Sequence, residues 1–240
     1  MKGMIIMSEL VKAPWGINAN GIKEELNVKP KIDLTPSFIF VPGTVNIFTD
    51  AAKDNSYSNA TISNCITITG CDGKRAMFPS ETRHISASTS TEAEISGVIY
   101  SLMKFNDSGI SANLVNIFTD SLHTVNILKP QFYSMNGMFM DNIVAQRFIS
   151  DLEDDPKVTE HIVLLCEERL RVKAPVNIWY VKAHTRDIML SRSKFAEVNK
   201  ESICVGDAIS INSMNTFVDT QVSLYSRCAG VYEQYEKPKY

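Results

Sequence analysis

The hexapeptide Val-Asn-Ile-Phe-Thr-Asp occurs twice in this chain, at residues 45–50 and again at residues 115–120. Each copy is an apolar, β-favouring run that ends in an aspartate, and the flanks of the two copies do not resemble each other. Two parallel neighbouring strands bring their carboxyl ends to one edge of a sheet, where ligands bind. We therefore expect Asp50 and Asp120 to lie side by side, which is unfavourable for two anions unless a cation lies between them. The alternative is that each aspartate only caps the segment that follows it.

The sequence around these two copies contains further strand and helix patterns. Residues 45–50, 61–69 and 75–86 are β-rich runs joined by short turns, which predicts an antiparallel meander. Residues 114–119 and 176–181 are further strands that alternate with helices. The expected helices are residues 92–106, 122–128 (ended by Pro130), 139–152, 158–171 and about 214–228. The sequence therefore predicts an α/β fold with a mixed five-stranded sheet, three strands antiparallel and then two parallel, flanked by helices.

Composition narrows the class of protein. A net charge of −3 argues against coating nucleic acid by bulk charge, although a local basic groove remains possible. The five cysteines form no Cys-x-x-Cys pair, so we expect reduced thiols and no structural zinc. No apolar run approaches the roughly 18 residues that a membrane span needs. We expect a cytoplasmic protein without a membrane partner.

A third carboxylate comes from the predicted helix at residues 92–106. Glu94 shares a stripe with Val98 and Leu102, at positions i, i+4 and i+8, so it should face the core. Glu92 lies about 200° away around the helix axis and should face solvent. An inward glutamate at the start of a helix that packs on the sheet requires a metal ion or a base as its partner.

One histidine follows the last predicted strand, and the other three have no comparable context. His184 follows a strand that we expect to run parallel to the strands that end in Asp50 and Asp120. Its side chain can therefore reach the same edge of the sheet and exchange protons with a departing product. A lone histidine after a strand is more often structural or on the surface. We expect His84, His123 and His161 to be structural or solvent-facing.

Taken in order, these motifs resemble those of ribonuclease HI. The matching segments are Ile47-Phe48-Thr49-Asp50, Ser90-Thr91-Glu92-Ala93-Glu94, Ile117-Phe118-Thr119-Asp120-Ser121, Val181-Lys182-Ala183-His184 and Asn215-Thr216-Phe217-Val218-Asp219. The last segment places Asp219 in the position of the family's final aspartate. The chain also resembles the longer ribonuclease H-like proteins of large bacteriophages, for which the location would be the host cytoplasm.

The resemblance implies an RNase H-like fold and endonucleolytic cleavage of the RNA strand of RNA/DNA hybrids, giving 5′-phosphate and 3′-hydroxyl ends. It implies two Mg²⁺ ions, with Mn²⁺ as a substitute, in a monomeric enzyme. Asp50 would bridge the ions, Glu94 and Asp120 would bind one, Asp219 would bind the other, and His184 would assist product release. The substrate contacts it implies are Ala51, Ala52, Ser90, Thr91, Ser121, Lys182 and Arg186.

The chain departs from the family in four places, one of which is Ser90-Thr91 where the family commonly has Asn-Asn. Ala51-Ala52 replace the usual Gly-Ser, and Leu122 replaces a frequent polar base contact. His184 and Asp219 are 35 residues apart, far more than the family's usual spacing. We therefore expect residues 1–42 to form an N-terminal arm and residues 43–240 a catalytic domain with an insertion at about 188–213, acting as a lid or substrate arm.

Several alternatives stay open at this point. Asp187 and Asp207 are weaker candidates for the fourth acid. The basic residues Arg171, Lys173, Lys182, Arg186, Arg192, Lys194 and Lys200 form either a solvated face or a phosphate-binding arm. The other functions considered are an exonuclease, a resolvase or transposase of the same fold, and a catalytically degenerate hybrid-binding protein.

Overall fold

The computed structural model describes residues 33–53, 59–136, 142–154, 160–182 and 185–236. Contacts divide the chain into two units, Met1–Leu34 and Thr35–Tyr240, and every element described below belongs to the second. No described helix is long and apolar enough to cross a membrane.

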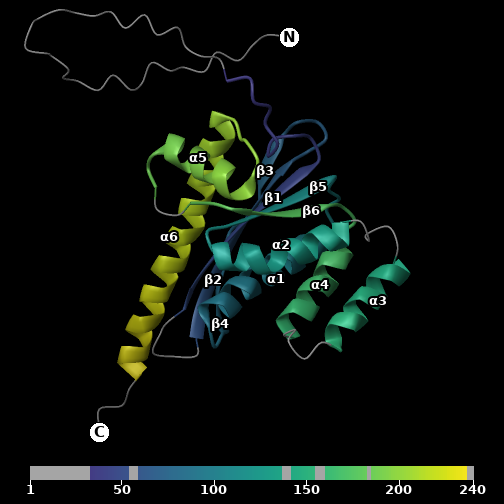
Figure 1. The fold of residues 1–240 in the computed structure, drawn as a ribbon. Helices are drawn as coiled ribbons and strands as arrows, with labels where there is room; N and C mark the ends of the chain where they lie inside the picture. Colours follow the sequence, from purple (N-terminus) through teal and green to yellow (C-terminus); the bar gives the residue numbers. More distant parts are fainter. Residues whose placement is uncertain (1–32, 54–58, 137–141, 155–159, 183–184, 237–240) are drawn as a thin grey trace, which may run out of the picture. The chain divides into compact units, whose positions relative to one another are not determined.

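Six strands form one mixed sheet (Figure 1). They are β1 (Thr44–Lys53), β2 (Asn59–Thr69), β3 (Arg75–Met77), β4 (Glu81–Ser86), β5 (Leu114–Thr119) and β6 (Val176–Tyr180). The main path runs β3-β2-β1-β5-β6, and β4 pairs with β2. Pairing is antiparallel from β1 to β2 and from β2 to β3 and β4, and parallel from β1 to β5 and from β5 to β6. The predicted mixed α/β sheet, antiparallel in its first part and parallel in its second, is confirmed.

The strand count is the main correction to the predicted sheet. Residues 75–86 form two short strands rather than one, and Phe78-Pro79-Ser80 separates β3 from β4. Both pair with β2, so the meander keeps its topology. Proline has no N–H to donate to a strand ladder, which explains the break at this point.

The two copies of the hexapeptide lie next to each other in register. Val45 pairs with Val115, and each following residue pairs with its counterpart as far as Phe48 with Phe118. The rings of Phe48 and Phe118 stack at 4.8 Å between centroids. Asn116 donates through Nδ2 to Oδ1 of Asn46 at 3.1 Å within the buried sheet. The repeat thus brings identical side chains together across the parallel pair.

Six helices complete the described part of the chain. They are α1 (Ser90–Asp107), α2 (Leu122–Asn136), α3 (Asn142–Glu153), α4 (Glu160–Arg171), α5 (Ile188–Asn199) and α6 (Val205–Glu236). The helices expected at residues 139–152 and 158–171 correspond to α3 and α4. The first residues of both expected ranges, 139–141 and 158–159, lie outside the described residues.

Two predicted helix boundaries are wrong. The helix expected to stop before Pro130 continues through it to Asn136. Its buried face carries on past the proline at Phe132 and Met135, and this packing offsets the lost backbone hydrogen bond and ring clash, which cost about 3 kcal/mol. The terminal helix begins at Val205 rather than near Met214, so it includes the second part of the predicted insertion.

Two layers of helices enclose the sheet (Figure 1). On one face, helices α1, α2 and α4 cover the larger core, which contains Val45, Ile47, Val115 and Ile117 from the central strands. On the other face, α5 and α6 cover a smaller core built around Phe48, Phe118 and Phe195. Alternation along each strand sends successive side chains to opposite faces, so the repeat supplies both cores.

The segment before β1 packs on the second face through Asp207 of α6. This buried carboxylate accepts hydrogen bonds from Oγ of Ser37 at 2.6 Å and from the backbone N–H of Phe38 at 3.0 Å. Phe38 lies 5.5 Å from Trp179 and 6.1 Å from Phe195 between ring centroids. The end of the predicted N-terminal arm therefore contributes to this core, while the domain boundary and the role of the arm stay predictions.

Candidate metal centre

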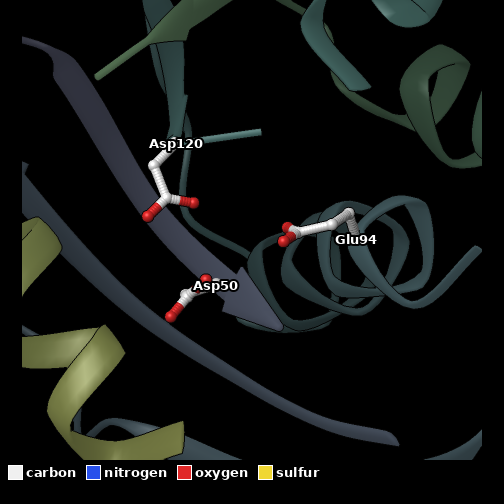
Figure 2. A group of neighbouring side chains, drawn as sticks. All are labelled: Asp50, Glu94 and Asp120. Carbon is white, nitrogen blue, oxygen red and sulfur yellow. The ribbon is translucent and has the colours of Figure 1, made fainter. Parts of the chain in front are cut away.

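Asp50 and Asp120 lie side by side at the edge predicted from the repeat (Figure 2). Asp50 lies within β1, which continues past the end of β5, and Asp120 directly follows β5. Asp50 is 6 % exposed, and its Oδ1 accepts a hydrogen bond from the N–H of Ala51 at 2.8 Å. The parallel register, rather than helix capping, explains why both acids end the same sequence pattern.

Glu94 of α1 points toward the two aspartates (Figure 2). The predicted orientation is confirmed, because Glu94 is buried while the side chain of Glu92 turns outward. Glu92 accepts from the N–H of Ser88 at 2.7 Å, and Thr89 caps the helix by accepting from the N–H of Glu92. Glu92 is therefore a helix-start residue, and Glu94 is the glutamate that belongs to the candidate metal site.

A glycine allows α1 to approach the sheet closely enough to deliver Glu94. A Cβ at Gly97 would lie 2.7 Å from Oγ1 of Thr49, which is closer than van der Waals contact permits. Thr119, the matching threonine of the second copy, donates through Oγ1 to Oε2 of Glu94 at 3.5 Å. The threonines of both copies thus face α1, one against the helix backbone and the other against the glutamate.

Burial and mutual repulsion make these carboxylates hard to ionise together. The pKa of Asp50 is raised to about 7, first by burial, then by the negative charge of Asp120 and, to a smaller extent, by that of Asp219. The N–H of Ala51 opposes this shift. The pKa of Glu94 is also raised well above its usual value, by burial and then by Asp50 and Asp120. A nearby positive charge would relieve both effects.

The donor set fits a divalent cation that prefers oxygen. One carboxylate oxygen from each of Asp50, Glu94 and Asp120 can be chosen so that all three lie within 4.8 Å of one another. Three carboxylates from two strands and a helix offer hard oxygen ligands, and Mg²⁺ completes its shell with water. The structure therefore defines a candidate metal centre at the carboxyl end of the two repeated segments.

Asp219 lies near this group without joining it. It is half-buried on α6, and it is close enough for its charge to raise the pKa of Asp50, but it is not a member of the compact group of three. The two weaker candidates for the fourth acid have other partners. Asp187 caps α5 by accepting from the N–H groups of Met189 and Leu190, and Asp207 holds the segment before β1. Asp219 stays the best candidate for a fourth ligand.

The structure describes only some of the other predicted site residues. His184 lies outside the described residues. Ala51 and Ala52 are half-buried in β1, Ser90 and Thr91 begin α1, and Lys182 and Arg186 flank the undescribed residues 183–184. Ser121 bonds through its hydroxyl to Thr124 and accepts from the N–H of Thr124. It therefore has a local role at the start of α2, and all the predicted substrate contacts, Ser121 included, stay predictions.

Most of the predicted basic stretch is engaged within the chain. Arg171 bonds to Asp107 and Glu168, and Arg192 donates to the carbonyl of Ile203. Lys194 pairs with Glu197 at 2.7 Å, and Lys200 donates to the carbonyl of the same Glu197. These contacts favour the solvated-face interpretation over a dedicated phosphate-binding arm.

Sequence analysis missed two residues at the end of β6, the strand next to β5. Tyr180 ends β6 near Asp120, whose charge helps burial to raise the tyrosine pKa. Asn199 at the end of α5 accepts from the N–H of Tyr180 and donates to its carbonyl, both at 2.9 Å. The asparagine thereby satisfies the free edge of β6 as another strand would. No local pattern could reveal a contact between residues 19 positions apart in a predicted insertion.

Comparison with known proteins yields a similarity to solved structures only. No protein-family model matches the chain, and no curated protein does. One matching structure is the RNase H1 of the halophilic archaeon Halobacterium salinarum NRC-1, at 16 % identity and a TM-score of 0.40. The match covers 66 % of this chain and 100 % of that chain. The function proposed below rests on the carboxylate geometry of this chain.

Proposed function

We propose that this protein is a metal-dependent nuclease of the ribonuclease H type that cuts the RNA strand of RNA/DNA hybrids internally. The observation that carries the proposal is the compact group of Asp50, Glu94 and Asp120 at the carboxyl end of two parallel strands. Buried carboxylates with raised pKa values are costly to keep charged, and a divalent cation removes that cost.

The proposed ligand roles of the four acids are those that the resemblance to ribonuclease HI implies. The charges of Asp120 and Asp219 both raise the pKa of Asp50, and Asp50 would be the carboxylate that serves both Mg²⁺ ions. Glu94 and Asp120 would hold one ion with it, and Asp219 the other. Bound in this way, Mg²⁺ or Mn²⁺ would activate a water and stabilise the leaving 3′-oxygen of a phosphodiester. We assign His184 to proton exchange with the product.

The sequence motifs support the choice of hybrid as the substrate. Ala51 and Ala52 are small residues directly after Asp50, and Ser90 and Thr91 provide hydroxyls at the start of α1. Lys182 and Arg186 would supply positive charge next to His184. We propose products with 5′-phosphate and 3′-hydroxyl ends, and action as a monomer.

The decisive experiment is cleavage of end-labelled duplexes with and without Mg²⁺. An RNA/DNA hybrid is compared with RNA/RNA and DNA/DNA duplexes of the same sequence. We expect internal cuts in the RNA of the hybrid alone, and a loss of at least roughly a hundredfold in Asp120→Asn, because even changes to groups that only hydrogen-bond to metal ligands cost ten- to a hundredfold. Asp187→Asn is the matched control, since asparagine caps a helix as well as aspartate does.

Each outcome of this experiment has a distinct meaning. Cuts that begin only at 3′ ends would point to an exonuclease. A branched DNA is included as a fourth substrate, and cuts confined to it would point to a resolvase. If Asp120→Asn and wild type bind the hybrid equally and neither cleaves it, the fold serves binding. Equal cleavage by Asp120→Asn and wild type would refute the proposed site.

Metal binding can be measured without activity. Isothermal titration with Mn²⁺ should show binding to the wild type and to Asp187→Asn, and a marked loss in Asp50→Asn. We expect Asp219→Asn to lose one of two binding events if this residue holds the second ion. Unchanged titrations for all variants would remove the basis of the assignment.

A further inference from the structure

The segment that follows β6 carries two of the predicted site residues, Lys182 and His184, and it begins next to the candidate metal centre. Tyr180 pairs with Thr119 across the parallel strands, and the residue after Tyr180 donates its N–H to the carbonyl of Thr119 at 2.9 Å. Asp120 directly follows Thr119 in the chain. The segment therefore leaves the sheet beside one of the candidate metal ligands.

An asparagine of α5 holds the end of β6 from the open side of the sheet. Asn199, the last residue of α5, accepts from the N–H of Tyr180 and donates to its carbonyl, both at 2.9 Å. β6 is the last strand on the sheet's main path, so the asparagine takes the place that a further strand would occupy. Asn199 is 4 % exposed, and hydrogen bonds are electrostatically stronger inside a protein than in water.

A second asparagine holds the other described end of the segment. Asn212 of α6 donates through Nδ2 to the carbonyl of Thr185 at 3.0 Å. The hydroxyl of Thr185 also accepts from the N–H of Asp187, the residue that caps α5, at 3.3 Å. Thr185 is therefore bonded both to α6 and to the residue that begins α5.

Both asparagines belong to residues 188–213, the insertion that the sequence predicts. Its helix α5 is anchored in the protein by other contacts. Phe195 is 2 % exposed, and its ring lies 5.8 Å from that of Trp179 between centroids. Arg192 donates through Nε to the carbonyl of Ile203 at 2.6 Å, which ties α5 to the residues before α6. The insertion is thus a packed support for both ends of the segment.

We propose that Asn199 and Asn212 are positioning residues that hold the two ends of residues 181–184. By fixing these ends, they keep Lys182 and His184 at the carboxylate edge of the sheet. This inference rests on the proposed nuclease function, which assigns substrate contact to the lysine and proton exchange to the histidine. Each asparagine acts through the backbone of its partner, and neither belongs to the group of carboxylates. The insertion serves as this support rather than as a lid or a substrate arm.

Holding the segment matters because proton exchange requires a fixed geometry. A general acid or base must lie within hydrogen-bond reach of its proton, and it contributes typically about 100- to 10,000-fold in rate. A misplacement of about 1 Å can cost roughly a hundredfold. The three-carboxylate centre is built on β1, β5 and α1, so it does not depend on this segment. Loss of either asparagine should therefore impair turnover and spare metal binding.

The first test follows the segment itself, without metal or substrate. Relaxation of ¹⁵N in the full chain measures the order of the amides of Lys182 and Thr185. In the wild type we expect order parameters near roughly 0.85, the value of rigid backbone. Asn199→Ala should lower the value at Lys182, and Asn212→Ala the value at Thr185, toward about 0.6, the value of flexible backbone.

Asn106→Ala is the matched control, because it also removes an asparagine that makes two hydrogen bonds. Asn106 donates through Nδ2 to the carbonyl and to Oε2 of Glu168, at 2.9 and 2.8 Å. It lies roughly 18 Å from Glu94 along the axis of α1. We expect the control and Asn199→Ala to lower the melting temperature by similar amounts, and only Asn199→Ala to lower the order at Lys182.

The second test measures turnover of the RNA/DNA hybrid in Mg²⁺. We expect kcat of Asn199→Ala to fall at least about tenfold, because the group that exchanges protons with the product is no longer held in place. The rate of the first cut should change less than about threefold, because the metal ions drive that step. Titration with Mn²⁺ should match the wild type, and Asn106→Ala should keep the wild-type kcat.

The outcomes separate this inference from the proposed function. If the wild type does not cleave the hybrid, the proposed function fails, and the order at Lys182 and Thr185 alone decides whether the asparagines hold the segment. The inference is overturned if both amides stay ordered in both variants. It is also overturned if an active wild type and Asn199→Ala share the same kcat, or if Asn106→Ala lowers kcat equally, since general destabilisation would then be the cause.

Discussion

The cores on the two faces of the sheet differ in the residues that form them. They also differ in how far apart along the chain the contributing segments lie. The face under α1, α2 and α4 holds a large, mainly aliphatic core. The face under α5 and α6 holds fewer residues, many of them aromatic, and it is tied together by buried polar groups. Glu94 comes from the first face and Asp219 from the second, so the site lies where the two meet.

The acids of the site are therefore held in place by different interactions on the two faces. Close packing fixes α1, and with it Glu94, against the strands that carry Asp50 and Asp120. The helix that carries Asp219 depends on hydrogen bonds such as those that Asp207 accepts. Losing such a hydrogen bond lowers the free energy of unfolding by a limited amount. We therefore expect damage to the first face to abolish the three-carboxylate centre, and damage to the second to spare it.

The largest expected effect is electrostatic and lies at the junction of the two faces. The folded pKa of Asp50 is about 7 against an ordinary value of 3.8, so the folded protein binds the proton more tightly than the unfolded chain does. The stability from this proton is present below pH 4 and is lost as pH rises through 7. For this group alone the difference corresponds to roughly 4 kcal/mol at most.

In EDTA, the contribution of Asp50 should therefore lower the melting temperature between pH 5 and 8, and Mg²⁺ should restore more stability at pH 8 than at pH 5. Asp50→Asn serves as the control and should show a flatter pH dependence. If the wild type and the variant showed the same pH dependence of melting temperature, the fold would not raise the pKa of Asp50.

The next largest effect is expected for Gly97→Val, which disrupts packing on the face under α1, α2 and α4. The side chain would overlap Oγ1 of Thr49 and push α1 from the sheet, at a cost of about 3 kcal/mol. Urea denaturation and Mn²⁺ titration should both show the loss. Gly97→Ala should be partly rescued in the double variant Thr49→Ala/Gly97→Ala, because that variant lacks the overlapping oxygen. No rescue would place the strain elsewhere.

Asp207→Asn tests the second face. The amide can accept from Ser37 or Phe38, but its NH₂ group meets a donor where the second carboxylate oxygen stood. We expect a loss of about 2 kcal/mol in unfolding free energy, with Mn²⁺ binding by the three carboxylates retained. If this variant lost metal as completely as Asp50→Asn, the proposed independence of the two faces would be wrong.

The smallest effect is expected for Trp179→Phe. The indole N–H donates to Oδ1 of Asn116 at 2.9 Å, while the ring packs near Phe38 and Phe195. Phenylalanine keeps most of the packing and loses the hydrogen bond, which should cost about 1 kcal/mol in urea denaturation. A loss above 3 kcal/mol would show that ring packing, rather than the asparagine contact, holds this face.

Much of the site could be predicted from local patterns. The repeated hexapeptide predicts two identical strands ending in aspartate, and the helical stripe of Glu94, Val98 and Leu102 predicts which glutamate faces inward. Both depend on short-range periodicity, which a sequence displays directly. The same reasoning failed at Pro130, because burial of Phe132 outweighs a local helix breaker, and at residues 75–86, where Pro79 interrupts a long β-rich run.

Local patterns in the chain are enough to predict the mixed sheet, the pairing of the two repeats and the identity of the three converging carboxylates. These features follow from strand and helix periods and from the rule that parallel strands end at one edge. Three other features emerge only in the folded chain. Asp187 caps α5 and Asp207 holds the segment before β1, Asn199 completes the edge of β6, and Gly97 lets α1 approach the sheet. Each of these depends on contacts between segments distant in the chain, and no local spacing encodes such contacts.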